Sequence, residues 1–271
     1  MGLVGCGTIG SVVAEAIDDG KIENASLIII YDIVPEHAEK LASKLKRRPL
    51  IARSLSEILE RSDVHIVVEA ASQEFVKEHA VEILSGNKDL LIMSVGALLD
   101  ESLLSEIIDV TRRTGRKVYV PSGAIVGIDN IKSAALGKVE EVILVTRKPP
   151  ESFRGTDLIE KSGIDISSIK EPLLLYEGPA RKAVEILPQN INVAATLSLA
   201  GIGPDKTKVR VIADPKIKDI IHEVYVRGEF GEMYTRTVNK PFPSNPRTSY
   251  IAALSAIATL KRITSNMLIG T

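Results

Sequence analysis

The chain has 271 residues, of which 45% are hydrophobic, and its 34 basic and 35 acidic residues leave a formal net charge of −1. This length predicts two domains or one large one, and the composition argues against disorder. The balanced charges give no reason to expect nucleic acid or an anionic membrane as a partner.

Cysteine content and hydropathy narrow the class further. Cys6 is the single cysteine, which excludes an intrachain disulfide and a cysteine-based metal site, and we predict no metal. No apolar run approaches the roughly 18 residues of a membrane span. A glycine-rich turn that starts at residue 5 leaves no room for a signal peptide. We therefore expect a cytoplasmic protein.

The first ten residues predict a dinucleotide-binding turn. Gly5, Gly7 and Gly10 have the G-x-G-x-x-G spacing, after a short apolar run and before a helical pattern. The first glycine permits a tight turn, the second lets the backbone approach a pyrophosphate, and the third lets the helix pack closely on the strand. The helix N-terminus then offers free N–H groups to the phosphates. The spacing alone occurs by chance in many proteins, so the prediction depends on the strand and the helix beside it.

Strands and helices alternate through the first 121 residues. A helix follows the glycine turn, and further helices are predicted at 36–46, 54–61, 73–84 and 100–114. Apolar strands are predicted at 26–31, 50–51, 64–68, 90–93 and 117–120, with a loop at 94–97. This alternation is typical of an α/β fold with a doubly wound parallel sheet, the Rossmann arrangement.

Asp32 closes the second strand, at the position where an acid binds the ribose hydroxyls of a dinucleotide. A helix-start or turn acid without such a role is the alternative. An acid here repels a 2′-phosphate and favours NAD over NADP. Four nearby cations are able to offset that preference: Lys46, Arg47, Arg48 and Arg53.

After Pro121 the pattern changes to that of an α+β domain with a mixed or antiparallel sheet. Helices are predicted at 128–136, 179–186 and 191–200, and strands at 141–148, 208–213, 222–228 and 232–239. We interpret 149–177 as a surface loop with a strand near 173–176, and 243–246 as a turn. A long apolar helix at 248–268 needs a core, and we expect it to pack on the first domain. The domains are thus predicted as 1–121 with 246–271, for dinucleotide binding, and an inserted 122–245, for substrate binding and dimerisation.

His222 is the histidine that we select as a candidate for catalysis. His37 and His79 fall on amphipathic helices, and His65 falls within a strand of the first domain, so those three are interpreted as surface or structural. His222 begins a strand of the second domain, where a strand end can face a cleft. Spacing alone favours a partly exposed strand histidine without a function.

Several sequence blocks resemble the L-aspartate dehydrogenase family along essentially the whole chain. They are GCGTIG at 5–10, EAAS at 69–72, SVGAL at 94–98, PSGAIVG at 121–127, LPQNINVAATLSLAGIG at 187–203, IHEVYVRGEFGEM at 221–233 and NPRTS at 245–249. The resemblance implies NAD- or NADP-dependent oxidative deamination of L-aspartate to iminoaspartate, which water hydrolyses to oxaloacetate and ammonia. It also implies that iminoaspartate supplies de novo NAD biosynthesis, and that the protein is a homodimer paired through the sheet of its second domain.

The resemblance assigns roles to individual residues. It makes His222 the catalytic acid/base, which suits an imidazole whose pKa lies near neutrality. It places Asn192 near the substrate, and we add Thr248 as a candidate substrate contact. Asn190 and Asn192 also suit a helix N-cap, and the two interpretations are compatible. The residues implied to bind the cofactor are Gly5, Gly7, Thr8, Ile9, Gly10, Asp32, Ala70, Ala97, Ala124 and Asn190.

A dicarboxylate substrate needs cations, and forked guanidinium groups suit carboxylates best. The sequence does not decide among the candidates Lys206, Lys208, Arg147, Arg247 and Thr248. Another dehydrogenase of amino-acid metabolism, such as homoserine dehydrogenase, is the enzyme alternative. A non-catalytic NAD-binding sensor is the alternative from a different class.

Overall fold

The computed structural model describes residues 1–187, 192–242 and 245–270, without the side chains of residues 246 and 247. The chain forms two compact units. Unit 1 comprises Met1–Pro121 and Ala253–Thr271, and unit 2 comprises Ser122–Ala252. Unit 2 thus ends at residue 252, whereas the sequence predicts its end at residue 245. Among the described residues, no helix is long and apolar enough to cross a membrane.

Unit 1 contains a six-stranded parallel sheet in the order β3-β2-β1-β4-β5-β6, as the α/β prediction required. The order reverses between β1 and β4, so the carboxyl ends of these two strands flank the crevice where such folds bind ligands. The strands are β1 (Gly2–Val4), β2 (Ile29–Tyr31), β3 (Leu50–Ile51), β4 (Ile66–Glu69), β5 (Asp89–Ile92) and β6 (Val118–Tyr119).

The helices of unit 1 follow the predicted order, with ends set by local caps. In α5, the Asp100 side chain accepts from the Leu103 N–H at the first turn, and Gly115 ends the helix at φ 71°. The loop predicted at 94–97 is instead a 3₁₀ helix, η1 (Val95–Leu99), which is buried throughout. The α-helices are α1 (Thr8–Asp18), α2 (Pro35–Ala42), α3 (Leu55–Leu59), α4 (Gln73–Ser85), α5 (Glu101–Thr114) and α10 (Tyr250–Thr264).

The last helix supplies part of the unit 1 core. Ala256 and Leu260 of α10 are fully buried and pack with Leu3, Val13 and Leu91. The C-terminal helix therefore packs in the core of unit 1.

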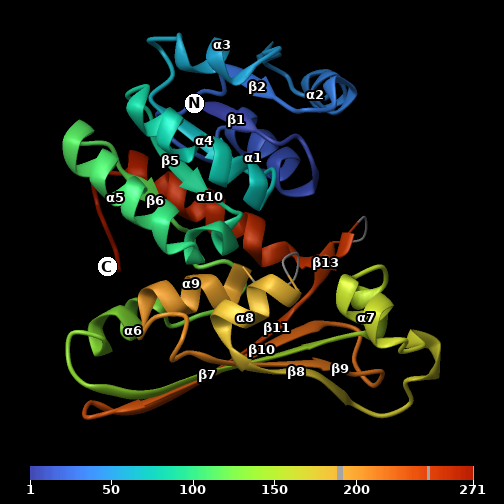
Figure 1. Ribbon diagram of the computed structural model, residues 1–271. Coiled ribbons are helices and arrows are strands. Elements are labelled where there is room, and N and C mark those ends of the chain that lie inside the picture. Colours follow the sequence, from blue (N-terminus) through green and yellow to red (C-terminus); the bar gives the residue numbers. More distant parts are fainter. Residues whose placement is uncertain (188–191, 243–244, 271) are drawn as a thin grey trace. The chain divides into compact units, whose positions relative to one another are not determined.

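Unit 2 is built on a five-stranded mixed sheet in the order β11-β10-β7-β9-β8. The β7–β9 pair is parallel, and the other pairs are antiparallel. Figure 1 shows α8 and α9 along one face of this sheet. The strands are β7 (Val139–Lys148), β8 (Leu173–Pro179), β9 (Lys208–Ala213), β10 (Ile220–Gly228) and β11 (Gly231–Asn239), and the helices include α6 (Ile128–Ala134), α8 (Ala180–Ile186) and α9 (Asn192–Ala200).

Alternating strand residues divide the sheet into a covered face and an open face. Val142 and Leu144 of β7 and Val224 and Val226 of β10 are buried in the core that the helices complete. Their neighbours in sequence point to the other side, where Tyr225 is exposed. We call these the covered face and the open face.

Two stretches of unit 2 differ from the prediction. Residues 149–177 form η2 (Pro150–Phe153), α7 (Asp157–Ser162) and η3 (Ile166–Ser168), and Phe153 is fully buried in the core. The segment is therefore structured because it contributes apolar side chains to the core, which its Pro, Ser and Gly content concealed. Near the predicted turn at 243–246, β12 (Pro241–Phe242) pairs with β13 (Asn245–Ser249), and residues 243 and 244 lie outside the described part.

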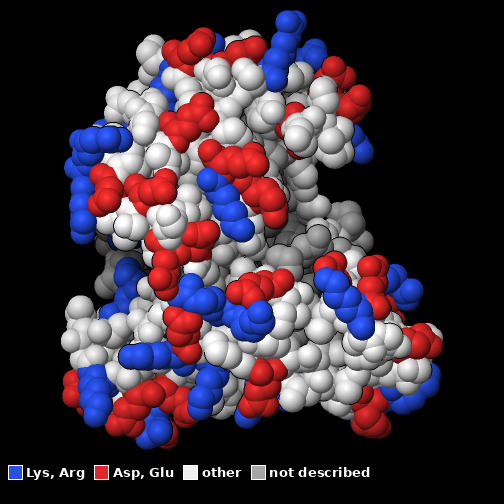
Figure 2. Space-filling model, in the orientation of Figure 1, with Lys and Arg blue, Asp and Glu red and all other residues white. Residues whose placement is uncertain are grey.

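Acidic and basic side chains are interspersed on the face that Figure 2 shows. Neither sign forms a continuous field on either unit in that view.

Candidate active site

The glycine turn has the geometry that a dinucleotide requires. Gly5 has φ +89°, and a Cβ there would lie 2.4 Å from the Ala70 carbonyl oxygen. A Cβ at Gly10 would lie 1.9 Å from the Gly5 carbonyl oxygen. Gly7 is different, because nothing lies within 4 Å of its missing Cβ. The first and third glycines thus allow the chain to pack on itself, and the second leaves open space.

The start of α1 fits a bound pyrophosphate. Gly7 is its N-cap and provides no side-chain acceptor for the first N–H groups of the helix. Thr8 and Ile9 form the first turn, and Ala70 directly follows β4, beside Gly5. These residues fit the cofactor that the sequence predicts. Ala97 lies within η1 and is fully buried.

Asp32 lies against the glycine turn. One carboxylate oxygen accepts from the Cys6 N–H at 2.7 Å, and the other accepts from the Val34 N–H at 2.9 Å. The His37 Nδ1 lies 3.4 Å from the second oxygen. These contacts position the carboxylate at the carboxyl end of β2, next to the turn, as a ribose-binding acid requires.

The Cys6 thiol is unreactive at neutral pH. Burial, and then the charge of Asp32, raise the pKa of its thiol to about 12. The thiol is therefore protonated at neutral pH, and we interpret it as a packing residue.

The sequence suggested that nearby cations offset the preference for NAD over NADP. Two of these cations lie at the far end of α1, away from the position of the ribose. The Lys46 and Arg47 N–H groups both donate to Asp18, and the Lys46 amine binds Asp19 at 2.6 Å. Asp18 ends α1, about 16 Å along the helix from the glycine turn at 1.5 Å per residue. Lys46 and Arg47 are thus fixed far from the ribose position.

Glu69 is a site residue that our sequence reasoning missed. It ends β4 and is fully buried, and its two oxygens accept four hydrogen bonds. One oxygen accepts from the Ala71 N–H at 2.8 Å and the Ser94 hydroxyl at 2.7 Å. The other accepts from the Met93 N–H at 3.0 Å and the Ser94 N–H at 2.9 Å. Burial raises the pKa of Glu69, and the hydrogen bonds from Ser94 oppose that rise. Through these hydrogen bonds, the Glu69 carboxylate holds the loop that follows β4 against the loop that follows β5.

Replacing Glu69 with glutamine is expected to lower the free energy of unfolding by about 1–3 kcal/mol. Whichever way the amide is turned, its NH₂ group faces a backbone N–H donor from Ala71, Met93 or Ser94. Urea unfolding measures the change, with the exposed Glu78→Gln as the control. Equal stability of the two variants would contradict a tying role for Glu69.

His222 lies on the covered face of the unit 2 sheet. It is 3% exposed and sits opposite Thr146 of β7 and Thr237 of β11 in the strand register. Its Nδ1 shares a hydrogen bond of 3.0 Å with the Thr146 hydroxyl. Burial, and then the nearby charge of Lys148, lower its pKa to about 3. The imidazole is therefore neutral at physiological pH, and is not the partly exposed histidine that spacing alone favoured.

A polar network on β11, the strand beside that of His222, holds Ala124. The Ala124 carbonyl accepts from the Thr237 hydroxyl at 3.0 Å and from the Asn239 amide at 3.0 Å. A Cβ on the preceding Gly123 would contact Val193 of α9 at 3.6 Å. The structure thus brings Ala124, the start of α9 and the His222 strand into one region of unit 2.

The remaining predicted residues are only partly located. Asn192 is the first residue of α9 and is partly buried, and Thr248 lies in β13 and is also partly buried. Asn190 lies outside the described residues, and so does the side chain of Arg247.

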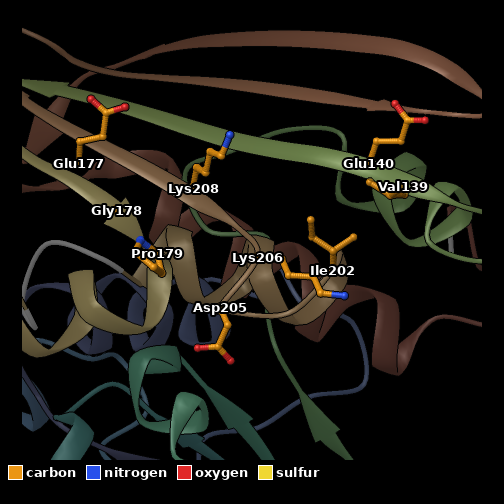
Figure 3. Close-up of a pocket in the computed structure, with 9 residues that line it drawn as sticks. All are labelled: Val139, Glu140, Glu177, Gly178, Pro179, Ile202, Asp205, Lys206 and Lys208. Carbon is orange, nitrogen blue, oxygen red and sulfur yellow. The ribbon is translucent and has the colours of Figure 1, made fainter.

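The lysines at 206 and 208 lie apart from His222, since Lys208 pairs with Ile143, three residues before Thr146 on β7. They line a pocket of about 620 Å³ with Val139, which Figure 3 shows together with its acidic neighbours. Val139 is seven residues before Thr146 on β7, or about 23 Å along an extended strand. Lys208 binds Glu141 at 2.9 Å. This pocket is therefore separate from the His222 region.

Burial of a neutral His222 makes stability depend on pH. In the unfolded chain the imidazole has its ordinary pKa of about 6.5, whereas the folded pKa is about 3. As the pH falls, the unfolded state binds a proton at a higher pH than the folded state does. The contribution of His222 to the unfolding free energy is therefore fully present above pH 6.5 and is lost as the pH falls toward 3.

We expect the unfolding free energy of the wild type to fall by about 2 kcal/mol more than that of His222→Asn between pH 6.5 and 5.0. Urea unfolding of both proteins at the two pH values provides the measurement. Parallel pH profiles would show that His222 titrates normally in the folded protein.

Comparisons with known proteins address the family. Residues 129–263 match the family model described as "Aspartate dehydrogenase, C-terminal". Residues 5–121 match the one described as "Homoserine dehydrogenase, NAD binding domain". The second match covers only the dinucleotide-binding part, so it supports the fold and the cofactor class and does not identify the substrate.

Curated relatives align along the full length. The L-aspartate dehydrogenases of Methanosarcina barkeri and Methanocella arvoryzae are each 46% identical over 271 residues, which is 100% of this chain and 99% of each relative. A crystal structure of aspartate dehydrogenase from Thermotoga maritima is 28% identical, with a TM-score of 0.75 over 99% of this chain and 98% of that one. By this full-length identity, the chain belongs to the L-aspartate dehydrogenase family.

Proposed function

We propose that this protein oxidises L-aspartate to iminoaspartate with NAD or NADP, and that iminoaspartate is hydrolysed to oxaloacetate and ammonia. The observation that carries the proposal is the 46% identity over the full length to proteins named L-aspartate dehydrogenase. The position of His222 supports it, because a ring whose Nδ1 bonds to Thr146 at 3.0 Å leaves Nε2 to accept a proton. In this proposal the iminoaspartate supplies de novo NAD biosynthesis.

Most of the residues proposed to hold the cofactor belong to unit 1. Gly5, Gly7 and Gly10 with the first turn of α1 would hold the pyrophosphate, and Asp32 would hold the ribose. The resemblance adds Ala70, Ala97, Ala124 and Asn190 to this set. When bound, the nicotinamide ring accepts a hydride. We propose a preference for NAD, because Asp32 would repel a 2′-phosphate and because Lys46 and Arg47 are held at the far end of α1.

His222 is proposed as the general acid/base. Converting the Cα–N bond to C=N requires the substrate ammonium to lose a proton, and attack of water on the imine requires a second proton acceptor. A neutral imidazole performs either step, and it returns a proton when ammonia leaves. For Nε2 to accept a proton, Nδ1 must carry the ring hydrogen and donate it to Thr146. Thr146 thus fixes which ring nitrogen is available. Asn192 and Thr248 are proposed to contact the substrate.

The experiment that tests the activity is a substrate panel. NADH or NADPH absorbance is followed while L-aspartate, D-aspartate, L-glutamate, L-malate and L-homoserine are offered with each cofactor. We expect turnover with L-aspartate and faster turnover with NAD. Turnover of L-homoserine without L-aspartate would favour homoserine dehydrogenase, and cofactor binding without any turnover would favour an NAD-binding sensor.

We also propose that the protein is a homodimer paired through the open face of the unit 2 sheet. That face carries partly exposed apolar and aromatic side chains, with Tyr225 and Tyr234 in ring contact at 4.6 Å and Val238 half exposed. The Tyr234 hydroxyl donates to Glu223 at 2.7 Å, and two arginines lie within 4.0 Å of the same carboxylate, so its charge is paired. Such a face is typical of protein interfaces.

Sedimentation of the wild type and of Val238→Asp tests the dimer. We expect a dimer for the wild type and a weakened dimer for the variant, since each copy would bury an unpaired charge. A monomeric wild type would contradict the proposal.

A cytoplasmic location is likewise proposed, on the grounds that the only cysteine is the protonated, buried Cys6.

A further inference from the structure

We infer that Lys148, which the sequence did not single out, binds a carboxylate group of the substrate. The inference rests on the proposed reaction and on the assignment of His222. Lys148 ends β7 and is 3% exposed. Of the lysines and arginines that the structure describes in unit 2, it alone is buried. Lysine is rarely buried, because burying a cation is costly unless an anion or other polar groups compensate it.

The strand geometry places Lys148 beside the proposed catalytic base. Lys148 is two residues after Thr146, so both side chains extend from the covered face, and Thr146 is directly opposite His222. Diagonal neighbours of this kind on antiparallel strands lie about 7–8 Å apart. The charge of Lys148 is felt at His222, where it helps to keep the imidazole neutral. A small amino acid can therefore place its nitrogen at His222 and a carboxylate at Lys148.

The other candidate cations lie on the open face of the sheet or away from His222. Arg147 lies on the open face, within 3.5 Å of Glu223 and 3.9 Å of Asp214. Lys206 and Lys208 line a separate pocket, and Lys208 alternates with the buried Val209, so it lies on the open face. Lys148 is thus the described cation of unit 2 that shares a sheet face and a strand end with His222.

The backbone around Lys148 is fixed, which suits a binding residue. Its carbonyl accepts from the Asp214 N–H at 2.9 Å, and Lys148 pairs with Ala213 of β9 in the parallel register. A side chain on the central strand of a sheet is held more precisely than one on a loop.

The test compares Lys148→Met with Lys148→Arg and with the exposed control Lys182→Met. The Met variant is expected to raise the KM for L-aspartate by about 10- to 100-fold, the effect of losing one charged hydrogen bond. The dissociation constant for NADH should be unchanged. Lys148→Arg should restore part of the affinity, because it restores the charge, and Lys182→Met should match the wild type.

A binding measurement separates this inference from the activity itself. Succinate has both carboxylates of aspartate and no amine, so it binds without reacting. Calorimetry should detect succinate binding to the wild-type enzyme–NADH complex and no comparable binding to Lys148→Met. If the Met variant does not fold, Lys148→Gln, which keeps a polar side chain without the charge, takes its place.

A purely electrostatic effect on His222 gives a different result. Removing the positive charge would then raise the His222 pKa and move the acid limb of the kcat profile to higher pH, while KM and succinate binding stayed within about 3-fold of the wild type. That outcome, or equal losses in Lys148→Met and Lys148→Arg, would overturn the inference. If the wild type binds succinate but does not oxidise L-aspartate, the proposed reaction is wrong and carboxylate binding by Lys148 still stands.

Discussion

Substituting asparagine for His222 is expected to lower kcat for L-aspartate by about 10²- to 10⁴-fold, the usual contribution of a general acid/base. Asparagine is similar in size and can still bond to Thr146, so the covered face should remain packed. The imidazole nitrogen that accepts the proton is lost. Because the folded pKa of His222 is about 3, the wild type should keep this base in its active form throughout the neutral range.

Steady-state kinetics with NADH absorbance measures this effect, and a fluorescence titration with NADH checks the cofactor. The dissociation constant for NADH should stay within about 3-fold of the wild type, since the substitution changes no residue of unit 1. His79→Asn provides the matched control, because His79 is a partly exposed histidine on α4 that pairs with Glu82. A normal kcat in His222→Asn would exclude His222 as the proton acceptor.

The second large effect is expected from two glycines that lie three residues apart. In Gly10→Ala the new methyl group would lie 1.9 Å from the Gly5 carbonyl, so helix α1 or the turn must shift. We expect a loss of about 1–3 kcal/mol in the unfolding free energy, together with the loss of NADH binding. In Gly7→Ala nothing lies within 4 Å of the new methyl group. Its stability should be unchanged or higher by up to about 1 kcal/mol.

Gly7→Ala should nonetheless weaken NADH binding, by about 10-fold or more, since the open space beside Gly7 is where the pyrophosphate approaches. Urea unfolding and NADH fluorescence titration, applied to both variants, separate the two roles. Equal stability losses would mean that Gly7 is also a packing residue. Unchanged NADH binding in Gly7→Ala would mean that the dinucleotide does not lie along this turn.

Local patterns in the sequence determined the fold of unit 1. The G-x-G-x-x-G spacing, the apolar strands and the alternating helices depend on neighbouring residues, so the parallel sheet and the packing of α10 were both predictable. Residues 149–177 were not, because Phe153 is recognised as a core residue only when the rest of that core is in place.

The site divides in the same way. The sequence, with its family resemblance, indicated the glycine turn, Asp32 and His222, each of which stands in a recognisable block. It did not reveal Glu69 or Lys148, whose importance depends on burial and on partners far along the chain: Ser94 lies on the next strand's loop, and His222 lies 74 positions after Lys148.

Tertiary structure also decided the chemical state of the groups. Whether His222 is a protonated surface residue or a neutral base depends on its burial on the covered face, and burial is a property of the packed sheet. The same packing places Lys46 and Arg47 against Asp18, at the end of α1 that lies far from the glycine turn. The sequence cannot show this, because it shows only that the two residues follow Asp32. The sequence by itself determined which fold and which family this protein has, because those follow from local periodicity and from motifs. The three-dimensional packing decided which side chains meet and which of them are charged, because desolvation and contact act between residues that are distant in the chain.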